Sequence, residues 1–351
     1  ALDLKYFNLP MITYYKHSPV INTLYNKNFI ELFGQPRINN DDKPVEQIYA
    51  DYASSMQKVF EDVVLSNLKN LKKKYNSKKL YLTGGCAFNT VLVGKIVQSK
   101  IFEKVIVGPN PGDAGGALGA ALYTSMKEKI EIENNSEQVF LGPNYSNDFI
   151  KKDIIDKIIH NNKYRINFYE NFDDITSKVA KIIDEQKIIF WFQDRMEWGP
   201  RALGNRSILA NPTEKNIKEI INLNIKKREL FRPFAPVVLK EHADNHFEMH
   251  NHESEYMNFV FNAKEKTKIN YSGIVHVDGT SRVQTVDKTQ NKKLYSLIQE
   301  FYKITNCPML INTSLNIKGP IALNPTDAFN YFKESEVKCL VLNNWVIELI
   351  N

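Results

Sequence analysis

The sequence is poor in cysteine and has no long apolar run. Its 351 residues include three cysteines, an odd number at wide spacing, Cys86, Cys307 and Cys339. Such a set argues against a disulfide framework and favours a reducing compartment, by default the cytoplasm. No apolar run approaches the roughly 20 residues that a membrane-spanning helix requires. The first residues also lack the basic and apolar segments of a signal peptide.

Excess charge is also lacking. Lys and Arg number 46 against 40 Asp and Glu, a net charge of +6. The total therefore does not indicate a nucleic-acid partner, and basic groups matter through local clustering. The length predicts about two domains, and 43% hydrophobic residues are enough for their cores. The chain has no initiator methionine and opens abruptly, so we expect a fragment of a longer protein.

The most informative stretch is basic and runs from Asp194 to Pro212, after an apolar strand-like run at 187–192. Its arginines, set among glycines and prolines, are Arg195, Arg201 and Arg206. A second basic stretch contributes Lys226, Lys227, Arg228 and Arg232. Guanidinium groups hold phosphate or carboxylate oxygens in charge-assisted pairs. Because apolar residues such as Trp198 and Phe231 alternate with these charges, burial is favoured over a solvated surface. The pattern predicts a buried anion site.

Two strand–glycine loop–helix units follow one another at 80–97 and 104–122. Glycines let backbone amides approach a phosphate, and a helix N-terminus favours negative charge. Glycine pairs also serve tight packing, and neither loop fits the dinucleotide or Walker patterns. Asp113 lies among glycines where no packing role calls for a carboxylate. The units therefore predict a nucleotide cradle with Asp113 as a candidate ligand of a divalent cation.

The remaining periodicity is of the α/β class. We expect residues 1–41 to be irregular, a long amphipathic helix from Asp42 to about Leu71, and a polar linker at 128–147. A separate α/β unit with a mixed sheet follows. Its expected helices are near 147–160, 175–185, 294–305 and 325–332, and its strands near 165–168, 187–192, 234–239, 256–261, 308–312, 339–342 and 345–350. The domains are accordingly placed at 1–145 and 146–351.

A run of histidines spaced like a metal site follows the basic stretches. His242, His246 and His250 would stack on one face of a helix, with His252 beyond them. A polar helix face is the favoured interpretation.

Six motifs occur in a fixed order along the chain. They are Thr83–Asn89 (TGGCAFN), Pro111–Ala121 (PGDAGGALGAA), Glu197–Ala210 (EWGPRALGNRSILA), Lys226–Pro236 (KKRELFRPFAP), Asp278–Val286 (DGTSRVQTV) and Leu310–Asn316 (LINTSLN). In this order they strongly resemble the O-carbamoyltransferases of the NodU/CmcH type, over nearly the whole chain. The resemblance implies an actin-like ATPase-type (ASKHA) domain, of which this chain holds the C-terminal half, followed by a YrdC-like domain.

The resemblance also implies an activity. The YrdC-like domain would convert carbamoyl phosphate and ATP to carbamoyl-adenylate, and the first domain would transfer the carbamoyl group to a hydroxyl of a small molecule. Carbamoyl phosphate is a small dianion, so positioning and charge compensation would dominate the catalysis. Asn312-Thr-Ser314 would bond the carbamoyl amide, which needs both a donor and an acceptor.

Site residues follow from the same resemblance. The catalytic candidates are Lys226, Arg232 and Asp3. The candidates for substrate binding are Arg201, Arg206, Ser207, Arg228, Arg282, Asn312, Thr313 and Ser314. The nucleotide loops would use Gly84, Gly85, Asn89, Gly115 and Gly116, and Asp113 would bind a divalent metal, either iron or Mg²⁺/Mn²⁺.

Family members carry roughly the first half of the actin-like domain ahead of Asp3, with a His-x-x-x-His pair that completes the metal site. We therefore expect either self-association, as in a homodimer, or completion by a missing N-terminal segment. Two alternatives to the small-molecule transferase remain. One is carbamoyl-adenylate chemistry on a protein or a tRNA-related acceptor. The other is a non-catalytic nucleotide-binding half that needs a partner chain.

Overall fold

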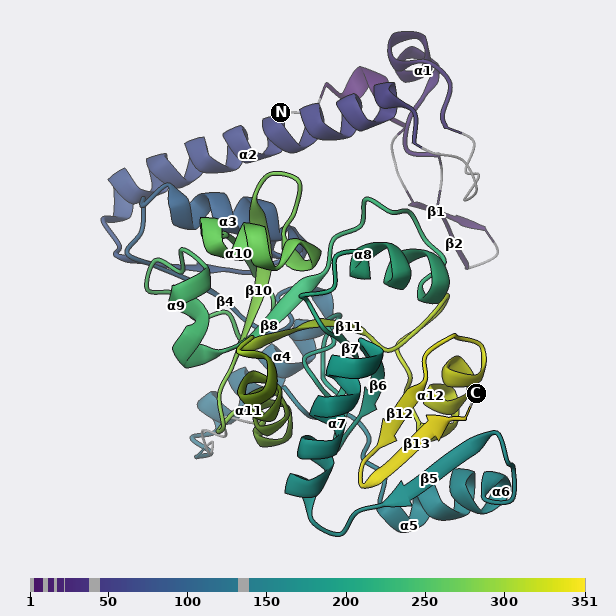
Figure 1. Ribbon diagram of the computed structural model, residues 1–351. Helices are drawn as coiled ribbons and strands as arrows, with labels where there is room; N and C mark the ends of the chain where they lie inside the picture. Colours follow the sequence, from purple (N-terminus) through teal and green to yellow (C-terminus); the bar gives the residue numbers. More distant parts are fainter. Residues whose placement is uncertain are drawn as a thin grey trace. The chain divides into compact units, whose positions relative to one another are not determined.

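The computed structural model describes residues 3–8, 12–15, 18–21, 23–37, 45–131 and 139–350 (Figure 1). The chain divides into two compact units, Ala1–Lys58 and Val59–Asn351. The functional division into residues 1–145 and 146–351 remains a prediction, because the first of these stretches contributes to both units. Residues 132–138 of the expected linker and 42–44 of the expected helix start lie outside the described ranges.

The first unit contains a hairpin and helices where irregular structure was expected. Its elements are η1 (Leu4–Tyr6), β1 (Ile12–Tyr15), β2 (Ser18–Ile21), α1 (Lys27–Phe33) and the start of α2 (Gln47–Tyr75). β1 and β2 pair in antiparallel register. Helix α1 begins where the Asn26 side chain accepts the N–H groups of Asn28 and Phe29, which are orphan donors of its first turn. α2 confirms the expected long helix and ends on three lysines, which complement the helix dipole.

The two glycine-loop units lie side by side in the second unit. Their elements are β3 (Lys79–Leu82), η2 (Gly85–Phe88), α3 (Thr90–Gln98), β4 (Lys104–Val107), η3 (Asp113–Gly115) and α4 (Gly116–Lys127). β3 and β4 pair in parallel. Helix α3 approaches a strand of the large sheet so closely that a Cβ on Gly94 would lie 2.4 Å from the carbonyl oxygen of Val260. The Asn258 side chain also donates to the Gly108 carbonyl at 2.7 Å. These contacts hold the glycine loops against the rest of the unit.

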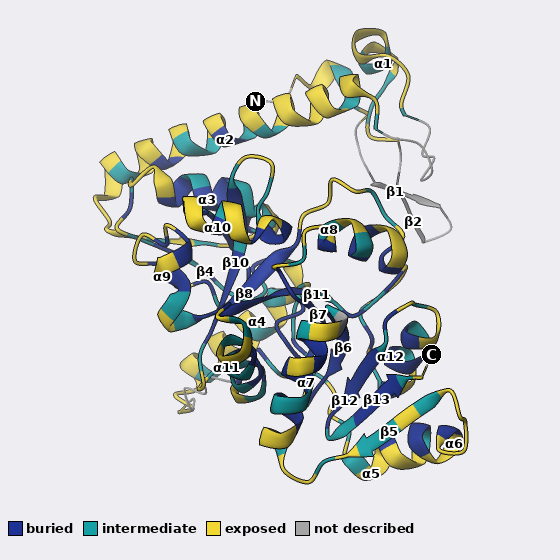
Figure 2. Cartoon of the chain, viewed as in Figure 1, coloured by how far each residue is buried: buried dark blue, intermediate teal, exposed yellow. Residues whose placement is uncertain are grey.

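A mixed nine-stranded sheet forms the centre of residues 139–350. In spatial order its strands are β5 (Tyr164–Phe168), β13 (Trp345–Leu349), β12 (Cys339–Leu342), β6 (Ile188–Phe192), β7 (Arg206–Ala210), β11 (Met309–Ser314), β8 (Ala235–Leu239), β10 (Thr280–Val286) and β9 (Phe259–Asn262). The β8–β10 and β6–β12 pairs are parallel and the others antiparallel. Several central strands are buried throughout (Figure 2), as expected for a sheet covered on both faces.

Helices cover both faces of this sheet. Adjacent residues of a strand point to opposite faces, and the ring of Phe190 meets Phe332 of α12 while Trp191 meets Phe172 of α7. The helices of this part are α5 (Asn147–Ile150), η4 (Lys151–Ile155), α6 (Asp156–Ile158), α7 (Phe172–Gln186), α8 (Ile217–Ile220), η5 (Ile221–Ile225), η6 (Lys240–His242), α9 (Ala243–His246), α10 (Glu265–Asn270), η7 (Ser272–Ile274), α11 (Lys292–Thr305) and α12 (Pro325–Lys333). The predicted α/β class with a mixed sheet is confirmed.

Two local expectations are corrected. Arg206 was placed in the glycine-rich turn, but it opens β7 and is fully buried. The histidine run is not one helix face, because α9 ends at His246. His246 and His252 are buried instead, and the Nε2 atom of His252 accepts the N–H of Val105 at 3.1 Å. Within the described ranges, no group of three or more His, Cys, Asp or Glu side chains is placed to hold a metal ion.

Candidate active site

One face of the large sheet gathers many of the predicted polar residues. Register places Ser207 of β7 opposite Ser314 of β11, and Asn312 two residues away on the same face. Through β8, the same face continues to Gln284 and Arg282 of β10. Thr313 lies between Asn312 and Ser314, so its side chain points to the other face. The sequence therefore predicted β8 and β11 but not β7 and β10, which carry no clear apolar–polar alternation, and it could not assign the faces of these strands.

Three arginines form a cluster at this face. Burial, together with the charges of Arg201 and Arg228, lowers the pKa of Arg282 to about 9. Burial also lowers the pKa of Arg201. For Arg228, burial and the charge of Arg232 lower the pKa to about 10, against the attraction of Glu229. Close positive charges that raise each other's energy are retained where an anion completes the site.

The donors of this cluster are only partly used. The Nε atoms of Arg201 and Arg282 are buried and have no hydrogen-bond partner among the described residues. Nε of Arg228 differs, because it donates to the Asn222 side chain at 2.7 Å while the guanidinium lies over the ring of Phe234. A buried unpaired donor is costly. Arg201 and Arg282 therefore provide the unfilled donor positions of an anion site.

Lys226 is a buried cation held by oxygen atoms. Its Nζ donates to both the carbonyl and the hydroxyl of Ser314, and to the carbonyl and side-chain oxygens of Asn316 at 2.9 and 2.6 Å. Burial, and then the charge of Arg228, hold the pKa of Lys226 well below its usual range. Asn316 was not predicted as a site residue, although it closes the quoted LINTSLN motif. Lys226 thus fixes the end of β11 beside the arginine cluster.

Arg206 has a structural environment. Its guanidinium lies over the ring of Phe192, 3.5 Å from the centroid, and donates to the carbonyls of Gln193, Asn205, Pro143 and Asp194. Burial lowers its pKa to about 10, opposed first by Glu197. Because four of its N–H donors are already used by the main chain, Arg206 can shape the site more readily than it can hold a phosphate.

Glu197 organises the loop between β6 and β7. One of its carboxylate oxygens accepts the N–H groups of Leu203, Asn205 and Arg206 at 2.7, 2.7 and 3.1 Å. The residue is buried. Carboxylate bonds to several backbone N–H groups are strong and fix a loop conformation. Glu197 stands in the EWGPRALG motif that the sequence singled out. Because a glutamate among arginines usually indicates an ion pair, its bonds to backbone N–H groups could not be predicted from that motif.

Two predicted catalytic residues lie at exposed positions. Arg232 is half-exposed and its Nε pairs with Glu229 at 2.8 Å, at the rim of the arginine cluster. Asp3 belongs to the first unit, where its carboxylate accepts the N–H of Lys5. That bond, followed by the Lys5 side chain, lowers the pKa of Asp3. A lowered pKa makes a carboxylate a weaker base.

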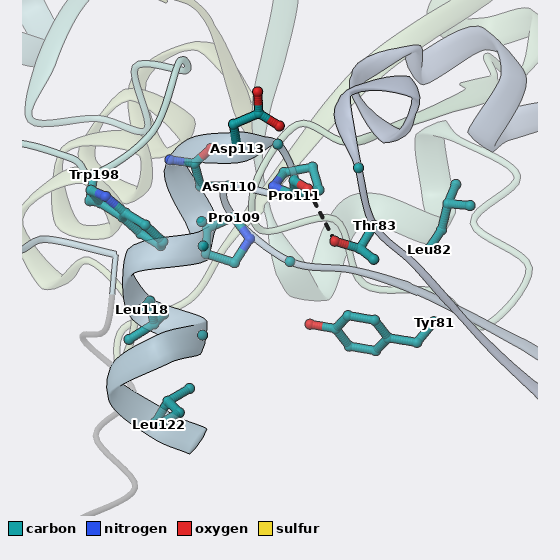
Figure 3. A pocket seen from close by; sticks show the side chains of 16 residues that line it. Tyr81, Leu82, Thr83, Pro109, Asn110, Pro111, Asp113, Leu118, Leu122 and Trp198 are labelled. Carbon is teal, nitrogen blue, oxygen red and sulfur yellow. Dashed lines mark hydrogen bonds between the residues drawn. The ribbon is translucent and has the colours of Figure 1, made fainter. Parts of the chain in front are cut away.

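A cavity of about 520 Å³ lies at the glycine loops (Figure 3). The loops meet where the N–H of Gly84 and the hydroxyl of Thr83 donate to the Pro111 carbonyl at 2.7 and 3.1 Å. A Cβ on Gly115 would lie 2.1 Å from the Asn110 carbonyl oxygen, so only glycine fits there. Trp198 reaches the same cavity from the loop that carries Arg201.

Only some of the residues predicted for the nucleotide loops line this cavity. Gly84, Gly115 and Gly116 line it, whereas Gly85 and Asn89 do not contribute to its lining. Asn89 instead accepts the N–H of Leu92 and caps α3. Asp113 is exposed and lines the cavity as a single carboxylate, without the further ligands that a metal site needs in the described part of the chain. The described residues therefore do not form a complete metal site.

Comparison with known proteins identifies the family. The model described as "Carbamoyltransferase N-terminus" matches residues 9–122, and that described as "Carbamoyltransferase C-terminus" matches residues 180–349. An uncharacterised protein of Synechocystis sp. is 35% identical over 99% of this chain and 60% of its own length. Nodulation protein NolNO of Sinorhizobium fredii is 37% identical over 87% of this chain and 45% of its own. Nodulation protein U of Azorhizobium caulinodans is 33% identical over 69% of this chain and 40% of its own length.

This chain belongs to the carbamoyltransferase family. It spans no more than 60% of the length of these relatives. Among solved structures, full-length HypF in its phosphate- and nucleotide-bound form gives a TM-score of 0.38 at 18% identity, over 54% of this chain and 23% of HypF. E. coli YciO gives a TM-score of 0.36 at 11% identity, over 49% of this chain and 78% of YciO. In the described ranges, no helix has the length and apolar character to cross a membrane.

Proposed function

We propose that this protein is part of an O-carbamoyltransferase that uses carbamoyl phosphate and ATP and transfers the carbamoyl group to a hydroxyl of a small molecule. The observation that carries the proposal is the cluster of Arg201, Arg228 and Arg282, whose charges oppose one another and two of whose buried Nε donors lack partners. A small dianion would supply both the missing acceptors and the missing negative charge.

The cluster would act by positioning and by compensating charge. In the overall reaction, carbamoyl phosphate, ATP and water give carbamoyl-adenylate, pyrophosphate and phosphate. Arg201 and Arg282 would hold phosphate oxygens, Arg232 would add charge from the rim, and Lys226 would fix Ser314 and Asn316 beside them. Fixed donors of this kind stabilise the charge that develops during phosphate chemistry without reorganising at the moment of reaction.

The glycine cavity would take the nucleotide portion during transfer. Its glycines leave room for a phosphate close to the backbone, and the N-terminus of the 12-residue helix α4 adds favourable dipole charge. Trp198 offers a flat aromatic surface at the cavity. Because Trp198 and Arg201 share one loop, that loop would contact both candidate sites.

The test is an exchange assay. Labelled pyrophosphate should enter ATP in a reaction that depends on carbamoyl phosphate, and Lys226→Ala and Arg232→Ala should each reduce the rate by roughly ten- to hundredfold. Lys74→Ala, on the exposed lysine run, should leave the rate unchanged. Normal exchange in both site variants would mean that the site is misplaced. Wild-type protein that binds nucleotide without exchange would instead favour the non-catalytic half. Carbamoylation of a protein or tRNA-related acceptor would favour the other alternative.

A further inference from the structure

His276 lies at the end of the face of β10 that carries Arg282. Its Nδ1 atom is 3.0 Å from the hydroxyl oxygen of Thr280, the first residue of that strand. Thr280 and Arg282 are two residues apart in β10, so their side chains point to the same face of the sheet. The charge of Arg282 also acts on the imidazole of His276. The ring therefore belongs to the surroundings of the anion site, although the quoted motif begins two residues later, at Asp278.

The hydrogen bonds around His276 show which ring nitrogen is already used. Thr280 Oγ1 lies 2.6 Å from a carboxylate oxygen of Asp278, which can only accept, so the hydroxyl hydrogen points to Asp278. Thr280 Oγ1 must then accept the hydrogen of His276 Nδ1. The main chain closes the same turn, because the N–H of His276 donates to the Thr280 carbonyl at 2.7 Å. Nδ1 is thus used within the turn, and Nε2 is the nitrogen that a ligand can reach.

Nε2 of His276 is buried and has no hydrogen-bond partner among the described residues. Burial lowers the pKa of His276 from 6.5 to about 4, a shift that Asp278 opposes and that Arg282 and Lys218 increase. Lys218 is held close by, since its Nζ donates to the carbonyl of Val275 at 2.6 Å. At neutral pH, Nε2 of the ligand-free protein therefore carries a lone pair and no proton. A lone pair cannot bond the oxygen atoms of a phosphate dianion, which are acceptors themselves.

A bound dianion changes this balance. Its charge compensates those of Arg282 and Lys218, the two cations that lower the pKa of His276. It also offers an acceptor to an Nε2–H group. A nearby opposite charge and a hydrogen bond to the charged form both raise the pKa of an imidazole. Because the ordinary pKa of histidine is 6.5, compensation of this kind returns the titration of His276 to the range near neutral pH.

We propose that His276 takes up a proton when a phosphate dianion binds, and donates it from Nε2 to a phosphate oxygen. This inference rests on the proposed function, which assigns the dianion to the donors of Arg201 and Arg282. The proton comes from the solvent and bonds to Nε2, and no covalent bond of the ligand changes. The imidazolium adds a third positive donor to the two arginines. It would also stabilise the charge on the phosphate group as this group leaves carbamoyl phosphate.

Calorimetric titration of the chain with sulfate counts this proton. Sulfate is a tetrahedral dianion that does not itself titrate near neutral pH, whereas inorganic phosphate does. At about pH 6 the wild type should take up roughly 0.5–1 proton per bound sulfate, measured from the dependence of the binding heat on the ionisation enthalpy of the buffer. The same linkage predicts that the affinity rises about three- to tenfold for each unit by which the pH falls.

Two variants of His276 remove the titrating group. His276→Gln places an amide near Nε2 that donates without titrating, so less than about 0.2 proton should be taken up and the affinity should change less than about twofold per pH unit. His276→Asn keeps a donor for Thr280 but has no atom at Nε2. It should also take up no proton, should bind sulfate about tenfold more weakly at about pH 6, and decides if His276→Gln does not fold. His160→Asn, at an exposed position, is the control and should behave like the wild type.

Four results would contradict the inference. Sulfate bound by the wild type without proton uptake would overturn it and leave the anion site intact. Proton uptake that persists in His276→Gln would assign the proton to another group, first of all Lys226, whose pKa burial also lowers. Binding of inorganic phosphate without binding of sulfate would count against it too, because a donor at Nε2 serves either dianion. A wild type that binds neither ion would overturn the proposed function as well.

Discussion

At the scale of single residues, the charge of Arg282 destabilises the ligand-free protein but is needed to bind the anion. It is a cation whose charge is opposed by Arg201 and Arg228 and by burial. Arg282→Met should therefore stabilise the ligand-free protein by about 1–4 kcal/mol, the range for replacing buried charged groups with apolar ones. The same change should abolish the rise in melting temperature that inorganic phosphate gives the wild type. Thermal unfolding with and without phosphate measures both effects. A destabilised variant that still responds to phosphate would contradict this role.

His246 should make the protein sensitive to mild acid. Thr267 donates its hydroxyl hydrogen to the His246 carbonyl, so its oxygen accepts the hydrogen of His246 Nδ1. Burial lowers the pKa of His246 to about 4, from an ordinary 6.5. The unfolded chain therefore binds the proton first. The stability that depends on a neutral His246 is fully present above pH 6.5 and is lost as the pH falls from 6.5 toward 4.

His246→Asn tests that window. The Asn amide can donate in place of Nδ1 but does not titrate, so stability measured by urea unfolding should fall less between pH 6.5 and 4.5 than in the wild type. His160→Asn, at an exposed position, should leave the wild-type slope unchanged. If the stability of His246→Asn falls with pH as steeply as that of the wild type, a group other than His246 causes the acid sensitivity.

At the scale of elements, the packing of α3 on β9 depends on one glycine. A Cβ on Gly94 would lie 2.4 Å from the backbone oxygen of Val260, which cannot move aside cheaply. Gly94→Ala should destabilise the protein by roughly 1–3 kcal/mol. Gly119 of α4 has no atom within 4 Å of its Cβ position, so Gly119→Ala should stabilise by about 0.5–1 kcal/mol. Equal effects of the two changes, measured by urea unfolding, would contradict the close approach of α3 to β9 at Gly94.

The sequence predicted elements better than it predicted the site. Buried runs such as Ile188–Phe192 and periodic helices such as α11 were located within a few residues. β7 and β10 were missed because Arg206, Ser207, Arg282 and Gln284 interrupt their apolar pattern, although all of them are buried or partly buried. Which donors are already used could not be predicted either. Arg206 and Arg201 look alike in sequence and differ only through the carbonyls that surround Arg206.

At the scale of the whole molecule, α4 lacks a covering layer among the described residues of the second unit. It is largely apolar, yet it has no buried residue, and Tyr123 and Met126 are 68% and 75% exposed. Contiguous exposed apolar surface marks an interaction site. We therefore expect this chain to self-associate, and Met126→Lys with Tyr123→Lys to reduce association in sedimentation velocity. Lys127→Glu, at the same helix end, should have little effect. Monodisperse monomer at high concentration would contradict the expectation.

We propose that the unpaired Nε donors of Arg201 and Arg282 hold the phosphate of the substrate. The most direct measurement is a crystal structure of the protein with inorganic phosphate or freshly dissolved carbamoyl phosphate. We predict phosphate oxygens within about 3 Å of both Nε atoms, and, with carbamoyl phosphate, the amino group against Asn312 Oδ1. Phosphate bound elsewhere, with both Nε atoms still unpaired, would contradict the account.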